Sequence, residues 1–104
     1  MDIGKSVLKL RQTKKLNQKT FAALVGMNQS YLSLIESNKK KPSTSMLQKI
    51  ADVNEVPLPL LMFFGLEISD VAESKRETFK TLKPLLDQLI VSLAEEKFSE
   101  ENDD

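Results

Sequence analysis

The sequence predicts an all-α fold, and three observations support this. Apolar residues recur at helical spacing along most of the 104-residue chain. Asn, Ser and Gly occupy positions where such helices would begin or end. A separate apolar run with heptad spacing lies near the C-terminus. We therefore expect five short helices in residues 1–66, a helical dimerisation or interaction segment in residues 67–98, and an acidic flexible tail in residues 99–104.

The first helix is expected over about residues 2–15. Ile3, Val7 and Leu10 follow one another at i, i+4 and i+7, which places them on one face of a helix. This face would point towards the core.

Residues 18–37 are expected to form two short helices on either side of a tight turn. Asn17 can cap the first helix, over residues 18–25, and Asn28 can cap the second. Gly26 lies where a chain leaving a helix turns through positive φ without steric cost. The residues expected to face inward are Phe21, Ala22, Val25, Leu32 and Ile35. This is the layout of a helix-turn-helix that reads DNA.

The second of these helices would present Gln29, Ser30, Ser33 and Leu34 outward. Small and amide-bearing side chains suit the major groove, where Gln can bond an adenine edge through two hydrogen bonds. The N-terminal end of such a helix also favours phosphate.

Two further helices are expected before residue 66. One begins after Pro42, with Ser43 or Thr44 as its cap, and ends near Val53 with Leu47, Ile50 and Ala51 inward. The next starts at Pro57 or Leu58 and ends at Gly65. It is apolar on every side, so it needs two partners. The second partner is either the C-terminal segment or a second subunit, which would contact Leu60, Met62, Phe63 or Phe64.

Residues 66–78 resemble a connector, with a possible helix start at Asp70-x-x-Glu73. A heptad seam follows, formed by Phe79, Leu82, Leu86, Leu89 and Leu93. Pro84 lies inside this pattern, so a helix over about residues 80–98 either begins close to it or kinks there. Its partner would be its own copy in a dimer, the favoured alternative, or the apolar helix before Gly65. Residues 95–104 are expected to fray as a solvated acidic tail.

The net charge of zero conceals a strong asymmetry. Residues 1–45 hold nine lysines and arginines against two acidic residues, a net charge of +7, so the remaining residues carry −7. A basic half that contains the helix-turn-helix is expected for a protein that binds phosphates, and the acidic half would limit nonspecific DNA affinity.

The composition argues against an enzyme. The absence of Cys and His excludes disulfides and thiolate chemistry, and removes the commonest metal ligand and the usual general base. The candidate catalytic carboxylate pairs, Glu95-Glu96 and Glu100-Glu101, lie in the tail. No apolar pocket is expected there that could shift their pKa values. No metal or cofactor is therefore expected. No signal peptide is visible, and the most apolar run, over residues 56–66, is too short to span a bilayer. We expect a cytoplasmic protein with no membrane association.

Several short motifs occur together in register. They are Ile3-Gly4, Leu10-Arg11, Leu16-Asn17-Gln18, Phe21-Ala22, Gly26, Ser33-Leu34-Ile35-Glu36, Lys39-Lys40-Lys41-Pro42 and Ile50-Ala51. Over residues 1 to about 65 this pattern resembles the Xre/Cro-type repressors, which have the five-helix fold of the lambda repressor DNA-binding domain. Three positions depart from the family pattern: Leu34 replaces a frequent Arg, Lys or Gln, Asn38 replaces Gly, and Asn54-Glu55 replaces Leu-Gly.

The resemblance implies roles for individual residues. Gln18 would hold a phosphate, Gln29, Ser30 and Leu34 would face base edges, and residues 38–40 would contact the DNA backbone. Arg11 and Glu36 would form an ion pair between two helices. The residues assigned to DNA contact are Gln18, Asn28, Gln29, Ser30, Ser33, Leu34, Asn38, Lys39 and Lys40.

The function implied is a regulator that binds double-stranded DNA in a sequence-specific manner, acting as a dimeric repressor on a pseudo-palindromic operator. The residues assigned to dimerisation are Phe63, Phe64, Phe79, Leu82, Leu86, Leu89 and Leu93. Two alternatives use the same fold: an antitoxin whose C-terminal extension grips a toxin, and an adaptor that binds another protein instead of DNA.

Overall fold

The computed structural model describes residues 1–95 and contains only helices in that range. They are α1 (Ile3–Thr13), α2 (Gln18–Val25), α3 (Gln29–Glu36), α4 (Thr44–Val53), α5 (Leu58–Phe63), the 3₁₀ turns η1 (Ile68–Asp70) and η2 (Glu73–Lys75), and α6 (Arg76–Ala94). The expected all-α fold is confirmed. The tail expected over residues 99–104 lies outside the described residues. None of the helices in residues 1–95 could span a membrane.

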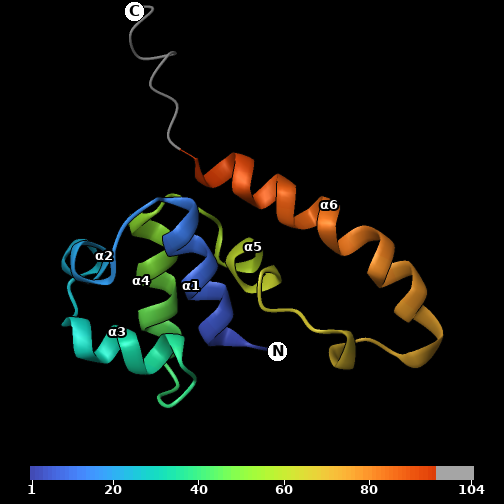
Figure 1. The fold of residues 1–104 in the computed structure, drawn as a ribbon, viewed down its shortest axis with the longest axis horizontal. Coiled ribbons are helices and arrows are strands. Elements are labelled where there is room, and N and C mark those ends of the chain that lie inside the picture. The colour runs from blue at the N-terminus through green and yellow to red at the C-terminus, as the bar shows by residue number, and fades with distance from the viewer. Residues whose placement is uncertain (96–104) are drawn as a thin grey trace, which may run out of the picture.

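Helices α1 to α5 enclose the main hydrophobic core. As Figure 1 shows, α1 to α4 form a compact group, with α2 and α3 side by side at one end. α1 packs against α3 and α5, and α2 packs against α3 and α4. The core side chains are those that the helical spacing places inward: Val7, Leu10, Phe21, Ala22, Val25, Leu32, Ile35, Leu47, Ile50 and Ala51.

Local caps fix the ends of the central helices. The Asn17 side chain accepts a hydrogen bond from the Thr20 N–H at 2.8 Å, and Asn28 does the same for Tyr31 at 2.8 Å. Ser43 Oγ accepts from the Met46 N–H at 3.1 Å. Gly26 adopts φ +86°, as its position between α2 and α3 requires. These caps set the turn that presents α3.

The corner between α4 and α5 turns without glycine. Asn54 is buried, and its Nδ2 donates to the Ile50 carbonyl at 2.7 Å. Glu55 then adopts the left-handed conformation, with φ +56°. The departure from Leu-Gly at this corner therefore leaves the turn intact, but it places a residue with a Cβ in a conformation that favours glycine.

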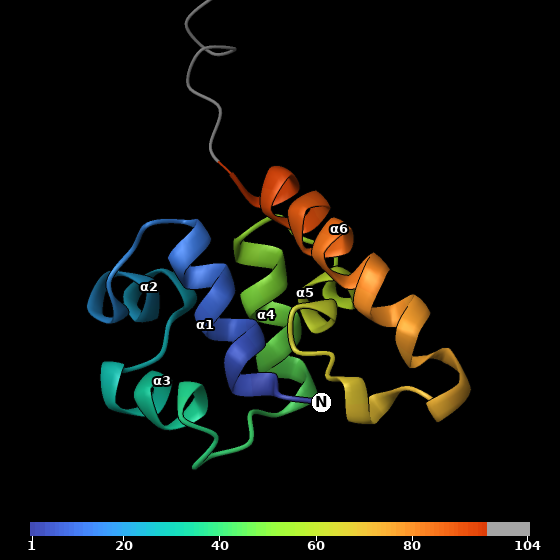
Figure 2. The same cartoon turned by 45° about the vertical axis from the view of Figure 1, so that its right-hand side comes forward.

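The C-terminal helix α6 lies along the outside of the core, against α1 and α5 (Figures 1 and 2). Its side chains Ile90 and Ala94 are buried against these helices. Lys83 Nζ donates to Asp87 at 2.6 Å and to the Phe64 carbonyl at 3.5 Å, while Asp87 also pairs with Lys9 at 3.5 Å. The apolar α5 thus has the C-terminal segment of its own chain as its second partner.

The boundaries of α6 differ from the sequence prediction. The helix begins at Arg76, not near residue 80, and Pro84 lies inside it on an exposed position. Arg76 Nε donates to the Val71 carbonyl at 3.1 Å, a contact that secures the first turn. The helix ends at Ala94, four residues before the expected end, because Ala94 is its last residue packed on the core. Residues 96–98 of the expected helix lie outside the described residues.

Smaller corrections concern α1 and the connector. α1 covers residues 3–13 and not 2–15, because Asp2 caps it by accepting the Lys5 N–H at 2.9 Å and Lys15 turns out of it with φ +59°. The connector forms η1 and η2 in place of a helix beginning at Asp70-x-x-Glu73.

The residues assigned to dimerisation are divided between the protein interior and its surface. Phe64, which we expected among the dimer contacts, is fully buried beneath α6 and offers no surface to a second subunit. Phe79 and Leu86 are half-buried, while Leu82, Leu89 and Leu93 are exposed. The division arises because α6 uses one side of the stripe to pack on its own core.

Candidate nucleic-acid interface

The outer face of α3 gathers the residues expected to read bases. Gln29, Ser30 and Ser33 are exposed, and Leu34 retains 39% of its accessible surface. These four side chains, together with Gln18 at the start of α2, line an open hollow of about 380 Å³. The structure thus brings together residues that are up to 16 positions apart in the sequence. The hollow carries amide and hydroxyl groups that can donate and accept hydrogen bonds.

Glu36 links three helices at the edge of this hollow. Arg11 Nε donates to Glu36 Oε2 at 2.7 Å, and Arg11 Nη2 donates to Oε1 at 3.0 Å. The Glu36 side chain is only 5% exposed and that of Arg11 15%, so water screens this two-bond ion pair weakly. Arg11 Nη1 also donates to the Leu16 carbonyl at 2.9 Å, which ties the loop before α2 to α1.

Gln18 shares the same carboxylate. Its Nε2 donates to Glu36 Oε1 at 2.9 Å, so the amide at the start of α2 has a fixed orientation. An amide nitrogen carries two N–H donors, and this bond uses one of them. The first backbone N–H groups of a helix have no partner inside the helix. The start of α2 therefore combines an oriented side-chain donor with backbone donors, as a phosphate contact would need.

Asn28 serves mainly as a cap. Its Oδ1 accepts the Tyr31 N–H, so this oxygen is committed to the start of α3. The residue is exposed beside Gln29. A DNA contact by its amide nitrogen remains a prediction.

Asn38 connects the loop after α3 to the start of α1. Its backbone adopts φ +60°, the left-handed conformation that Asn tolerates in place of the usual Gly. Its Oδ1 accepts the Gly4 N–H at 2.9 Å, and its Nδ2 donates to Asp2 Oδ1 at 2.7 Å. Because these groups face α1, Asn38 positions the loop. The contacts of Asn38, Lys39 and Lys40 with the DNA backbone remain predictions.

The partners of Asn38 were not among the residues predicted from the sequence. A Cβ at Gly4 would lie 2.6 Å from the Ile35 carbonyl oxygen and 2.7 Å from Asn38 Oδ1, so only glycine allows this approach. The Asn38 amide and then the Lys5 N–H, both bonded to Asp2, hold the pKa of that carboxyl below its usual value. In the sequence, the glycine of the Ile3-Gly4 motif is the one feature consistent with this close approach.

Lys39, Lys40 and Lys41 are all exposed directly after α3. Within residues 1–95, no carboxylate lies within ion-pair distance of any of the three. Among the described residues, their positive charge is thus not neutralised at the end of α3. Such a loop attracts a polyanion.

Residues 7–61, just over half of the chain, match the family model described as "Helix-turn-helix". The chain belongs to this helix-turn-helix family. The match begins within α1 and ends within α5, so it includes the α2–turn–α3 unit and leaves α6 outside. This helix-turn-helix protein is a DNA-binding transcription regulator of the Xre and lambda repressor type. Comparisons with curated proteins and with solved structures gave no match.

Proposed function

We propose that this helix-turn-helix protein recognises a specific double-stranded DNA sequence and acts as a dimeric repressor on a pseudo-palindromic operator. The observation that supports this best is the open hollow on α3, where four outward side chains adjoin Gln18. Base-reading and phosphate-binding groups are adjacent there, as an element docked in the major groove needs.

Base recognition would come from the first turns of α3. Gln29 can bond an adenine edge through two hydrogen bonds, and Ser30 can donate to or accept from a base edge. Leu34 offers only apolar contact, which suits a thymine methyl group. Specificity therefore depends mainly on Gln29 and Ser30.

Phosphate contacts would fix the position of α3 in the groove. Gln18, whose amide is oriented by Glu36, would bind one phosphate at the start of α2. Lys39 and Lys40 would bind phosphates beyond the end of α3. Such contacts contribute affinity that falls steeply with salt but carry no sequence information.

A dimer is supported by the outer face of α6. Four leucines on this face keep about half of their accessible surface: Leu82 48%, Leu85 61%, Leu89 53% and Leu93 52%. The other exposed positions between residues 81 and 94 hold Thr81, Pro84, Gln88 and Ser92, so this face carries no charge. Lys83 and Asp87 are turned towards the body of the protein. An uncharged leucine face of this kind is typical of an interface.

A second copy is the occupant we propose for this leucine face. A face without charge can meet its own copy across a two-fold axis without repulsion. Two recognition helices would then read half-sites about 34–36 Å apart or a multiple of that spacing. The antitoxin alternative is supported by the same leucine face, which a toxin could cover instead.

The test is selection of bound duplexes from a random DNA pool by the full chain at near-physiological salt, followed by sequencing. A two-fold symmetric motif is the expected result. A single unsymmetric motif would contradict the dimer and leave sequence recognition in place. Recovery of DNA without enrichment would contradict the proposed function and favour the adaptor.

A further inference from the structure

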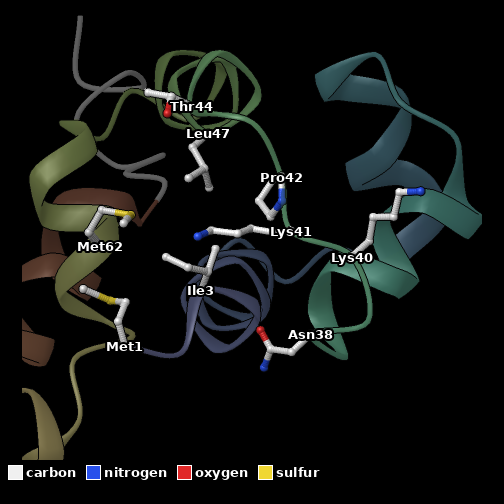
Figure 3. Close-up of a pocket in the computed structure, with 9 residues that line it drawn as sticks. All are labelled: Met1, Ile3, Asn38, Lys40, Lys41, Pro42, Thr44, Leu47 and Met62. Carbon is white, nitrogen blue, oxygen red and sulfur yellow. The ribbon is translucent and has the colours of Figure 1, made fainter.

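A second cavity lies beside the start of α1, separate from the hollow on α3. Its volume is about 580 Å³, within the range of about 300–1,000 Å³ typical of small-molecule sites. Figure 3 shows that its walls come from α1, from the loop after α3, and from α4 and α5. Its apolar lining is formed by Met1, Ile3, Pro42, Leu47 and Met62, and its polar lining by Asn38, Lys40, Lys41 and Thr44.

The two lysines of this cavity differ in direction. In Figure 3 the Lys41 side chain extends across the cavity towards Ile3 and Met62, whereas the Lys40 side chain points away from them. Lys41 is exposed as a residue, and its ammonium group lies over the apolar lining of the cavity. Lys75 in η2 serves as the control lysine, because it is exposed and lies outside both the cavity and the residues assigned to DNA contact.

Within the part of the chain that the structure describes, three carboxylates around the start of α1 are engaged elsewhere. Asp2 accepts hydrogen bonds from Asn38 and from the Lys5 N–H. Glu67 and Asp70 hold the Met1 ammonium at 3.1 Å and 2.7 Å. Within residues 1–95, no acidic group lies within ion-pair distance of Lys41. Among residues 1–95, the cavity thus combines an apolar lining with a cation that has no counterion.

We propose that this cavity binds a small apolar carboxylate, with the carboxylate at Lys41 Nζ and an alkyl chain or aromatic ring against Ile3, Leu47 and Met62. Each half of such a ligand meets the group that suits it: a charge-assisted hydrogen bond at one end and burial of apolar surface at the other. A neutral apolar ligand would leave the ammonium unpaired, and inorganic phosphate would leave the apolar lining uncovered.

The cavity also offers a route to regulation, and this second step rests on the proposed function. Lys41 directly follows Lys39 and Lys40, which we assign to phosphate contact. A carboxylate at Lys41 would neutralise one positive charge beside these contacts and so weaken DNA binding. The ligand would then release the protein from its operator.

The test uses sodium octanoate as the probe and the full chain, with calorimetry and NMR in the absence of DNA. Saturable one-to-one binding is expected, with chemical-shift changes at Ile3, Leu47 and Met62. Lys41→Gln should lower the affinity about tenfold, the loss of one charge-assisted hydrogen bond. Lys75→Gln should leave the affinity within about twofold, and octan-1-ol, which lacks the charge, should bind as weakly as octanoate binds Lys41→Gln.

A second variant, Met62→Gln, tests the apolar lining without changing the ammonium, and it should also weaken octanoate binding. Circular dichroism of each variant establishes that the helices are retained. Equal affinity of Lys41→Gln and the unaltered protein, no binding, or shifts confined to the leucine face of α6 would overturn the proposal. Loss of a dimer in Met62→Gln would also overturn the proposal, because a second copy of the chain would then be the occupant of the cavity.

The regulatory step has its own readout. Octanoate should weaken binding of the selected DNA to the unaltered protein severalfold and leave Lys41→Gln unaffected. Octanoate binding with unchanged DNA affinity would overturn this step alone. Octanoate binding by a protein without sequence preference would overturn the proposed function and leave the ligand site standing.

Discussion

Arg11 on α1 and Glu36 at the end of α3 form a two-bond ion pair, with distances of 2.7 Å and 3.0 Å, in a site where both side chains are largely buried. The same carboxylate binds the Gln18 amide. The pair therefore joins the scaffold, the recognition helix and the proposed phosphate-binding residue through one side chain. A change at Glu36 should affect both stability and DNA affinity.

Glu36→Ala should lower the free energy of unfolding by about 3–5 kcal/mol, because it leaves the Arg11 charge partly buried without a partner. Urea unfolding of Glu36→Ala and of the double variant Arg11→Met with Glu36→Leu would test this. The double variant should regain most of the loss, since neither charge remains. A loss below about 1 kcal/mol for Glu36→Ala would mean that water compensates Arg11.

Gln29→Ala and Lys39→Ala should have different effects on DNA binding. Gln29→Ala should cost about 1–3 kcal/mol on the selected sequence and relax preference at one base pair. Lys39→Ala should weaken binding to all sequences alike and reduce the salt slope by about one. Titrations of selected and random duplexes at several salt concentrations measure both. Equal losses on both duplexes for both variants would contradict the assigned roles.

How far the sequence could predict this structure depends on the range of the interactions. Asn17, Gly26 and Asn28 act within a few residues, so their caps and turn could be predicted directly. The contact of Asn38 with Gly4 spans 34 residues, and no local pattern indicated it. In general, a local pattern identifies a helix and its caps but cannot state which loops the fold brings against it.

The C-terminal helix shows the same limit. Its sequence holds an outer stripe of leucines and an inner stripe that contains Lys83 and Asp87. Heptad spacing cannot decide which stripe meets the core. The structure pairs Lys83 with Asp87 and with the Phe64 carbonyl, so these charges are compatible with partial burial.

The leucine face of α6 gives a prediction about assembly. Leu85→Asp combined with Leu89→Asp should shift the sedimenting mass from dimer to monomer, because a charge at the centre of an apolar contact has no partner there. Leu24→Asp on α2 is the matched control, since Leu24 is 56% exposed, within the range of the α6 leucines. A dimer that persists in the double variant would place the interface elsewhere.

The first residue predicts how stability depends on pH. The hydrogen bond from the Met1 ammonium to Asp70 raises the pKa of the amine above its usual 8.0, and the same bond lowers the pKa of Asp70. The raised pKa contributes stability that is fully present below about pH 8 and is lost as pH rises through the folded-state pKa. The lowered pKa of Asp70 stabilises the folded state above the usual pKa of 3.8. This stabilisation is lost as pH falls through the lowered pKa.

Urea midpoints measured from pH 7 to pH 10 would test the alkaline part of this dependence. Asp70→Asn should flatten the curve above pH 8, and acetylation of the N-terminus should do the same. Glu73→Gln changes an exposed carboxylate nearby that has no ion-pair partner among the described residues, so it should leave the curve unchanged. An identical alkaline slope in Asp70→Asn would show that the contact of Met1 with Asp70 does not contribute.

Glu55 gives the last prediction, because it occupies the left-handed conformation with φ +56° at the corner between α4 and α5. A residue with a Cβ costs about 1–2 kcal/mol there relative to glycine, while glycine loses more entropy on folding. Glu55→Gly should therefore stabilise the protein by about 0.5–1 kcal/mol, measured by thermal and urea unfolding. Asp52→Gly, inside α4, should instead destabilise it by about 0.5 kcal/mol, because glycine is the weaker helix former and the change removes the acceptor of the Gln48 Nε2 hydrogen bond. Destabilisation by Glu55→Gly would show that the Glu55 side chain makes a favourable contact that outweighs the backbone strain.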